Sequence, residues 1–175
     1  MLGGPRSGKS AVAERLVTAA AAGTDRPVTY LAPAGVAPDD AVHPARIDIH
    51  RARRPASWLT VECRRPADRV TALAARPAGP VLVDSIGTWV TSHPDLTVDP
   101  TGLVAAQQAR PAPTVVVAEE VGLAVHPPSA LGRRYVDAVG RVNQAVASVA
   151  DRALLVVAGR ILELGPPPAG SEPVR

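Results

Sequence analysis

The sequence predicts an α/β domain with a mainly parallel central sheet flanked by helices. Short apolar runs, bounded by Gly, Pro and Asp, alternate along the chain with longer segments of helical character. Several runs are apolar throughout, as in parallel sheets that are covered on both faces. The 175 residues suffice for one hydrophobic core. The single cysteine, Cys63, excludes an intramolecular disulfide and fits a reducing compartment.

The first predicted elements alternate between helix and strand. The Ala-rich segment Ser10–Ala22 is predicted as a helix. The run PVTYLA at Pro27–Ala32 is predicted as a short buried strand. Pro44 is expected to precede a helix or helical turn at Ala45–Arg53.

The middle of the chain continues this alternation. Ser57–Cys63 alternates in polarity like a strand, and Pro66–Arg76 is predicted as a helix. Pro80–Asp84 and Thr114–Ala118 are apolar runs predicted as buried strands. The polar, Pro-punctuated stretch between residues 92 and 113 is predicted to hold at most a short helix near Gly102–Arg110.

The last third of the chain contains the longest helical pattern. It covers Ser129–Ala150, with Ser129 as the expected N-cap. Ala153–Val157 is predicted as a strand and Arg160–Leu164 as its hairpin partner. We expect residues 1–165 to form one domain and residues 166–175 a disordered tail.

The composition argues against several classes of protein. The net charge is +3 with acids and bases interspersed, and there are only four aromatic residues, so neither a basic nucleic-acid tail nor a stacking platform is expected. No apolar run is long enough for a membrane span, and no signal-peptide pattern is present. We therefore expect a cytoplasmic protein.

A phosphate-binding loop is predicted near the amino end. Residues Gly3-Gly4-Pro5-Arg6-Ser7-Gly8-Lys9-Ser10 fit the pattern G-x-x-x-x-G-K-[ST]. In such a loop, backbone N–H groups and a helix amino end face the phosphates. Lys9 is expected to reach the β- and γ-phosphates, and the Ser10 hydroxyl to bind Mg²⁺. The alternative is an ordinary Gly-rich turn.

Lys9 is the only lysine, whereas the other eighteen basic residues are arginines. A compact charge on a flexible stem suits this loop better than the planar arginine fork, which explains a lysine at this position. Only Met1 and Leu2 precede the loop, so the strand that should lead into it is expected to be almost missing. Our hypothesis for this short strand is that the natural protein starts a few residues upstream, or that the chain is truncated.

Asp84, at the end of PVLVD, is the preferred candidate for a second acid at the phosphate site, where a carboxylate can hold Mg²⁺ directly or through water. Its alternative role is a helix N-cap. Glu119 and Glu120, which follow TVVVA, compete for the same metal role.

One of the four histidines lies among clustered cations. His50 is followed by Arg51, Arg53 and Arg54, so a neutral imidazole there is placed to attack phosphorus while the arginines hold phosphates. The alternative is a solvated basic surface. The other three, His43, His93 and His126, are expected to be surface loop residues.

Several stretches together resemble a known enzyme family. They are GGPRSGKS, RIDIHRARRPASW with TVE just after it, VLVDSIGTWV, EVGLAVHP and YVDAVGRVNQAVASVADRALLVVAGR. The chain resembles the bifunctional adenosylcobinamide kinases / adenosylcobinamide-phosphate guanylyltransferases of cobalamin biosynthesis. The phosphate loop is common to many families, but the stretch from the histidine to RPxxW and the GRVNQ segment are much more specific.

The resemblance implies a P-loop NTPase fold of the RecA-like type and a homotrimer. It also implies phosphorylation of adenosylcobinamide by ATP or GTP, followed by transfer of GMP from GTP to adenosylcobinamide phosphate through a GMP–histidine intermediate at His50. Mg²⁺ is the implied cofactor. No nucleic acid or membrane span is implied. The implied nucleotide contacts are Gly3 to Ser10, Ala32, Pro33, Ala34, Arg51, Ala52, Arg53, Arg54, Glu62 and Asp84.

The chain departs from the family pattern at several positions. Glu119 stands where relatives usually have Asn, and an added negative charge near phosphates is expected to be unfavourable. Asp84 stands where relatives often have Glu, and Ile49 precedes His50 where some relatives have a second histidine. The segment between Trp89 and Pro113 is shorter than usual. The stretch from Gly140 to Gln144 has no predicted role beyond helix packing.

Two rival functions remain open on the sequence alone. The chain is alternatively a P-loop kinase of another small alcohol with a structural His50, or a nucleotide-binding subunit without turnover. The sequence does not identify the base of the kinase step, for which Glu120 and Glu62 are the candidates.

Overall fold

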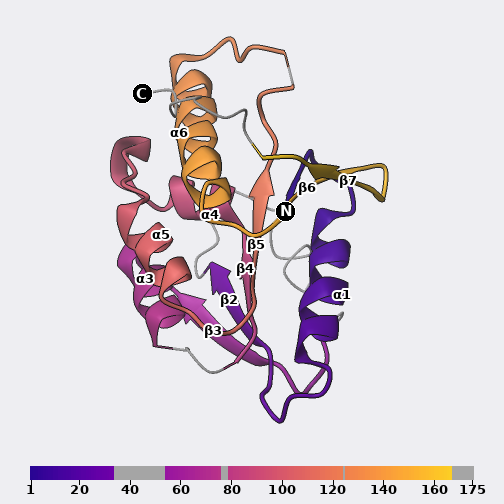
Figure 1. Cartoon of the computed structure of the whole chain (residues 1–175). Helices are drawn as coiled ribbons and strands as arrows, with labels where there is room; N and C mark the ends of the chain where they lie inside the picture. Colours follow the sequence, from indigo (N-terminus) through magenta and orange to yellow (C-terminus); the bar gives the residue numbers. More distant parts are fainter. Residues whose placement is uncertain (34–53, 76–78, 124, 167–175) are drawn as a thin grey trace.

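The computed structural model describes residues 1–33, 54–75, 79–123 and 125–166. These residues form a seven-stranded sheet in the order β3-β2-β4-β5-β1-β6-β7. Every neighbouring pair is parallel except β6 and β7, which are antiparallel. Helices cover both faces of the sheet (Figure 1). The predicted α/β class with a mainly parallel sheet is therefore confirmed.

The strands lie close to their predicted positions. β6 (Ala153–Val157) and β7 (Arg160–Leu164) match the prediction at both ends, including their hairpin pairing. Four other strands begin and end within two residues of their predicted bounds: β2 (Thr29–Pro33), β3 (Leu59–Cys63), β4 (Val81–Asp84) and β5 (Thr114–Glu119).

The first strand, β1 (Leu2–Gly3), is short but occupies the interior of the sheet. It pairs with β5 on one side and with β6 on the other. The Met1 amino group donates to the Val116 carbonyl at 2.9 Å, and the Glu120 N–H donates to the Gly3 carbonyl at 3.1 Å. Two residues thus suffice to join the two halves of the sheet.

The helical segments include two short ones that the sequence did not predict, one of them the 3₁₀ turn at Pro94–Leu96 in the stretch expected to hold at most a helix near Gly102–Arg110. α4 (Ile86–Thr91) directly follows β4. The other helical segments are α1 (Lys9–Ala21), α3 (Pro66–Ala74), the 3₁₀ turn η1 (Pro94–Leu96), α5 (Thr101–Gln108) and α6 (Ala130–Ala147). Ser129 caps α6 as predicted, because its hydroxyl accepts the Gly132 N–H at 3.0 Å. The predicted helix at Ala45–Arg53 and the tail from residue 167 lie outside the described residues.

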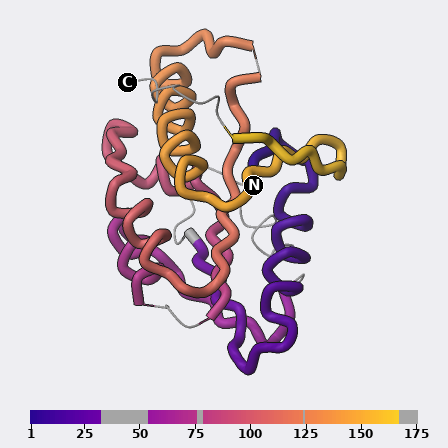
Figure 2. The backbone as a smooth tube through the Cα atoms, in the orientation of Figure 1, coloured from indigo at the N-terminus to yellow at the C-terminus, as the bar shows by residue number. Residues whose placement is uncertain are grey.

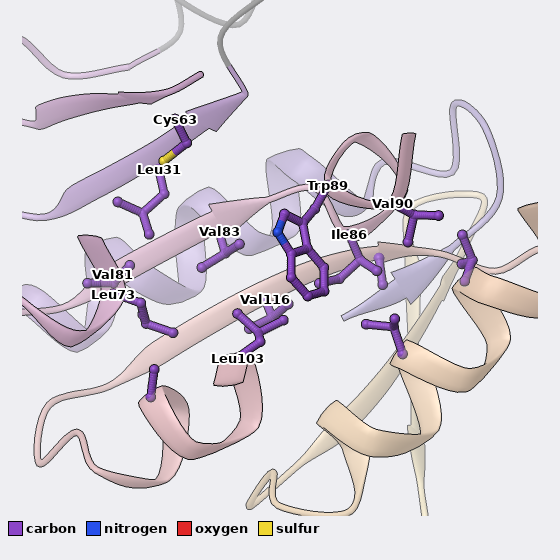
Figure 3. Close-up of a cluster of buried hydrophobic side chains, with 14 of the residues drawn as sticks. Leu31, Cys63, Leu73, Val81, Val83, Ile86, Trp89, Val90, Leu103 and Val116 are labelled. Carbon is purple, nitrogen blue, oxygen red and sulfur yellow. The ribbon is translucent and has the colours of Figure 1, made fainter. Parts of the chain in front are cut away.

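The core divides into two layers because successive strand residues face opposite sides of the sheet. Leu31, Val81, Val83 and Val116 pack with Trp89 and Leu103 from α4 and α5 in the larger cluster (Figure 3). Their strand neighbours Tyr30, Leu82 and Val117 pack with Ala13 and Val17 of α1 on the other face. The tube in Figure 2 shows α1 apart from the other helices, across the sheet.

The parallel strands place the sequence-predicted loops on one edge of the sheet. The phosphate loop follows β1, Asp84 ends β4, Glu119 ends β5, and the β6–β7 turn follows Val157. Ligands of open α/β sheets bind outside this carboxyl edge. Within the described residues, no helix has both the length and the apolar character needed to cross a membrane.

Candidate functional site

The segment between β1 and α1 has the conformation of a phosphate-binding loop. α1 begins at Lys9, and its N-cap Gly8 has φ 92°, a left-handed conformation that favours glycine. No described side chain caps this helix end. The first N–H groups of α1 are therefore available for an anion, and the helix dipole favours negative charge there.

Gly3 is required because the loop folds back on it. A Cβ at Gly3 would lie 2.5 Å from Ser7 Oγ and 2.8 Å from the Val156 carbonyl oxygen. The Ser7 N–H closes the turn by donating to the Gly4 carbonyl at 3.3 Å. Ser7 Oγ is buried without a hydrogen-bond partner among the described residues. Any side chain at Gly3 would consequently force the loop apart.

The Lys9 side chain lies along this loop. Its Nζ donates to the Gly4 carbonyl at 3.2 Å. The ammonium group therefore stays beside the backbone that would surround the phosphates. Exchanging this neutral carbonyl for a phosphate oxygen would give the lysine a stronger, charge-assisted hydrogen bond.

Asp84 ends β4 at the same edge, half-buried, beside Val117 of β5. The N-cap of the following helix is not Asp84 but Ser85, whose hydroxyl accepts the Thr88 N–H at 3.5 Å. The alternative prediction of Asp84 as an N-cap is therefore wrong. The peptide bond between Asp84 and Ser85 is cis.

A buried arginine supports this turn from behind. Arg69 of α3 is 2% exposed, and its Nη1 donates to the Ser85 carbonyl at 2.6 Å. Burial lowers the pKa of Arg69, while the Cys63 thiol and the Asp84 carboxylate nearby act in the opposite direction. The turn that carries Asp84 is thus held by a cation that the sequence did not single out.

Glu119 directs its carboxylate at the start of α4. Its Oε1 accepts the Ser85 hydroxyl at 2.7 Å, and its Oε2 accepts the Gly87 N–H at 2.6 Å. The Tyr135 hydroxyl is close enough that burial, with the Glu119 charge, raises the Tyr135 pKa to about 12. The extra charge that was expected to conflict with phosphates is instead engaged by two donors of the β4–α4 turn.

α6 is tied to the same place through Asn143. The Asn143 Nδ2 donates to the Glu119 carbonyl at 3.0 Å. This gives a role to the GRVNQ segment, for which the sequence suggested only helix packing. The specificity of that motif was the signal that marked Asn143. Ser85 and Tyr135 lie in other stretches that carry the resemblance, VLVDSIGTWV and YVDAVG, whereas Arg69 lies in none of them.

Glu120 lies next to the phosphate loop through its backbone, which donates to Gly3. Its Oε1 accepts the Gly122 N–H at 2.7 Å, so the carboxylate turns toward its own loop. Glu119 and Glu120, the two alternatives to Asp84 as Mg²⁺ ligands, thus each accept a backbone N–H, from Gly87 and Gly122 respectively.

A second group of predicted residues lies at the β2–β3 edge. Arg54 stacks on Tyr30, with its guanidinium carbon 3.7 Å from the ring centroid, and its Nη1 donates to the Thr60 hydroxyl at 3.3 Å. Burial, followed by the Asp84 charge, raises the Tyr30 pKa. Arg54, Trp58 and Glu62 line a shallow pocket of about 450 Å³. The structure therefore brings together two predicted nucleotide contacts, Arg54 and Glu62.

The remaining predicted residues divide into described and undescribed ones. Ala32 and Pro33 belong to β2, where Ala32 lies beside Glu62. Ala34 and the segment from His50 to Arg53 lie outside the described residues. Glu62 also forms an exposed ion pair with Arg64 at 3.6 Å.

The other histidines have different surroundings. His126 is exposed, as expected. His93 is half-buried: its Nδ1 lies 2.8 Å from the Trp89 carbonyl oxygen, and its ring meets the Trp89 ring edge to face. His93 is thus a packing residue, and not simply a surface loop residue. His43 lies outside the described residues.

The side chains predicted to hold Mg²⁺ supply oxygen ligands, as this ion prefers. No cluster of three or more His, Cys, Asp or Glu side chains that could hold a metal ion occurs in the described parts of the chain. Mg²⁺ prefers oxygen ligands and retains several waters when nucleotide phosphates complete its shell. The Ser10 hydroxyl and the Asp84 carboxylate are the two side-chain oxygens predicted for such an ion.

Comparisons with known proteins show which family this chain matches. Residues 1–164 match a family model described as cobinamide kinase / cobinamide phosphate guanyltransferase. The chain is similar to the bifunctional adenosylcobalamin biosynthesis proteins CobU of Salmonella typhimurium and Escherichia coli, with 47% identity over 57 residues in each case. These matches cover 33% of this chain and 32% of each relative, so the chain spans about a third of the curated relatives in these alignments.

Proposed function

Because the chain belongs to the cobinamide kinase / cobinamide phosphate guanyltransferase family, we propose that it carries out both reactions in cobalamin biosynthesis. The fold is accordingly a P-loop NTPase fold of the RecA-like type. The family match over residues 1–164 carries the proposal, and the loop between β1 and α1 supports it. The substrates would be adenosylcobinamide, its phosphate, and ATP or GTP.

In the kinase step, the hydroxyl of the adenosylcobinamide side chain attacks the γ-phosphorus, and the nucleoside diphosphate leaves. Lys9 and the loop N–H groups would hold the phosphates in line with that attack. Ser10 and Asp84 would hold Mg²⁺, which when bound offsets negative charge on the phosphate oxygens. Glu120 and Glu62 are the two proposed bases: the backbone of Glu120 adjoins Gly3 of the loop, and Glu62 lies on the outermost strand, β3.

In the transfer step, an imidazole nitrogen of His50 attacks the α-phosphorus of GTP. A P–N bond forms, the bond to the β-phosphate oxygen breaks, and pyrophosphate leaves. A phosphate oxygen of adenosylcobinamide phosphate then attacks the same phosphorus, and the P–N bond breaks to regenerate the histidine. A neutral imidazole is available near pH 7 without extreme pKa tuning.

The remaining contacts are proposed for the nucleotide. Arg51, Arg53 and Arg54 would hold its phosphates, since the guanidinium fork binds phosphate oxygens bidentately. Backbone groups of Ala32, Pro33, Ala34 and Ala52, together with Glu62, would complete the site. The stacking of Arg54 on Tyr30 and the pocket it shares with Glu62 support this assignment.

We also propose that the protein assembles as a homotrimer, as its resemblance to the family implies. Large apolar side chains are exposed on the β6–β7 hairpin, namely Val157, Ile161, Leu162 and Leu164. Exposed apolar residues on an edge strand favour association with another chain, here a second copy. Light scattering of the purified protein measures the assembly directly.

The decisive experiment uses GTP labelled at the α-phosphate. The protein is incubated with this GTP and Mg²⁺, denatured, and assayed for retained label, with His50→Ala and the exposed control His126→Ala in parallel. We expect acid-labile, alkali-stable label in the wild type and in His126→Ala, and none in His50→Ala.

The outcomes separate the rival functions. If folded wild-type protein binds GTP but retains no label, it does not carry out the transfer step. The remaining functions are then a kinase without transferase activity and a nucleotide-binding subunit without turnover, here called a silent subunit. Phosphorylation of a small alcohol in place of adenosylcobinamide would support a different kinase. Nucleotide binding without any turnover at saturating adenosylcobinamide would support a silent subunit.

A further inference from the structure

We propose that the β6–β7 turn positions the phosphate loop for nucleotide binding, and that Gly159 is the residue through which it acts. The inference rests on the proposed function only in taking nucleotide phosphates as the ligand of the loop. It adds a contact from the far end of the chain that no sequence motif of phosphate loops contains.

The turn contacts the loop directly. The Gly159 N–H donates to the Ser7 carbonyl at 2.8 Å. The approach is close, since a Cβ built at Gly8 would lie 3.4 Å from the Gly159 Cα. The contact joins residues at opposite ends of the described chain, and β6 reinforces it by pairing Val156 with Gly3 at the start of the loop.

This hydrogen bond fixes the direction of one loop N–H group. The Ser7 carbonyl and the Gly8 N–H belong to the same planar trans peptide, so they point in opposite directions. A phosphate loop requires its N–H groups to point inward and its carbonyls to point away from the anion. By holding the Ser7 carbonyl, Gly159 orients the Gly8 N–H before any phosphate binds.

The orientation of Gly159 depends on an uncommon turn. Ala158 and Gly159 have φ 49° and 73°, and they join Val157 to Arg160 in a two-residue hairpin. Positive φ at both central positions is the type I′ pattern, which suits the twist of the flanking strands. It costs conformational energy at a residue with a Cβ such as Ala158. A residue at position 159 that rejects positive φ would therefore turn the N–H away from Ser7.

Gly23 provides a matched control. It has φ 83° in the turn after α1, and a Cβ at Gly23 would meet no atom within 4 Å. A Cβ at Gly159 would likewise meet none. Both positions therefore impose the same kind of backbone strain on a substituted residue, but only Gly159 contacts the loop.

The test compares Gly159→Val and Gly159→Asn with Gly23→Val and Gly23→Asn. The measurements are the Kd of ATP and of inorganic tripolyphosphate by calorimetry, and the Tm of each variant. Asn tolerates positive φ whereas Val does not. We expect Gly159→Val to raise both Kd values about tenfold or more. We expect Gly159→Asn to bind nearly as the wild type does, and both Gly23 variants to keep wild-type Kd values even where Tm falls.

Each outcome decides one question. Equal binding by the wild type and folded Gly159→Val would overturn the positioning role alone. Loss of binding in Gly23→Val to the same degree would overturn it too, since general destabilisation would then explain both. If Gly159→Val does not fold, Gly159→Ala decides in the same way with a smaller expected rise in Kd. A wild-type protein that binds neither ATP nor tripolyphosphate would overturn the proposed function itself.

Discussion

At the scale of single residues, Glu119 shows how a carboxylate can be accommodated close to the proposed phosphate site. It accepts hydrogen bonds from the Ser85 hydroxyl and the Gly87 N–H, and its own carbonyl accepts from Asn143. The residue therefore joins the ends of β4 and β5 to the beginning of α4 and to α6. Its charge is compensated by donors that the fold already supplies.

We expect Glu119→Gln to lower the free energy of unfolding by about 1–3 kcal/mol. The amide keeps the shape of the side chain but removes its charge, so the hydrogen bonds with Ser85 and Gly87 are no longer charge-assisted, and the Ser85 hydroxyl must turn from donor to acceptor. Urea unfolding at neutral pH measures the change.

Glu163→Gln is the control for this substitution, because Glu163 forms an exposed ion pair with Arg152 at 2.8 Å. Exposed ion pairs contribute little to stability. If Glu163→Gln destabilised the protein as much as Glu119→Gln, the role assigned to Glu119 would be refuted.

At the scale of secondary-structure elements, the start of α6 is capped by the Ser129 side chain. The Ser129 hydroxyl accepts the Gly132 N–H, and no acidic residue stands in the first turn. Asn143, further along the helix, contacts Glu119 at the site. Loosening the start of α6 therefore weakens an element that reaches the carboxyl edge of the sheet.

Ser129→Ala is expected to destabilise the protein by about 0.5–2 kcal/mol, because the helix loses the acceptor for one of its free N–H groups. Ser129→Asp should retain the stability, since aspartate is an equally good N-cap and its charge suits the helix dipole. Thermal unfolding followed by circular dichroism compares the three proteins. A Ser129→Asp variant as unstable as Ser129→Ala would contradict the capping role.

The elements also show how far the sequence could be interpreted. β6, β7 and the Ser129 cap were predictable, because apolar runs, turn residues and caps are local signals. α4 was missed because six residues span fewer than two helical turns, too few to show a 3.6-residue period.

The site was predictable only where its chemistry lies in consecutive residues. The predicted phosphate loop is such a segment, and it leads into α1, which begins at Lys9 after the left-handed N-cap Gly8. The contacts of Glu119 and Arg69 join elements that are distant in the sequence. No local pattern encodes such pairings, so they became visible only with the packing of α3 and α4 against the sheet.

At the scale of the whole molecule, both tyrosines make the free energy of unfolding depend on pH in the alkaline range. Burial raises the pKa of Tyr30, and burial with the Glu119 charge raises that of Tyr135 to about 12. Each phenol therefore binds its proton more tightly in the folded protein than in the unfolded chain, where its pKa is about 10. The stabilisation from Tyr135 is complete below pH 10 and is lost as the pH rises toward 12, whereas that from Tyr30 persists to higher pH.

We expect the free energy of unfolding to decrease between about pH 10 and 12, and Tyr135→Phe to decrease less over the same range. Urea unfolding at several pH values measures the first effect. Absorbance near ~295 nm, where phenolate absorbs, should show both tyrosines of the native protein ionising above pH 10. Native tyrosines that ionise near pH 10, as in the urea-unfolded protein, would disprove the linkage.

The position of β1 has a consequence for how the chain is made. Leu2 is synthesised long before its partners Ala118 and Leu155. Contacts between such distant residues form slowly, because a long loop must close, at a cost in entropy, before the contacts can stabilise the chain. During synthesis, the predicted phosphate loop therefore lacks its neighbouring strands until β5 and β6 have been made. A nascent chain released before that point carries the whole nucleotide motif and still lacks the strand that gives it shape.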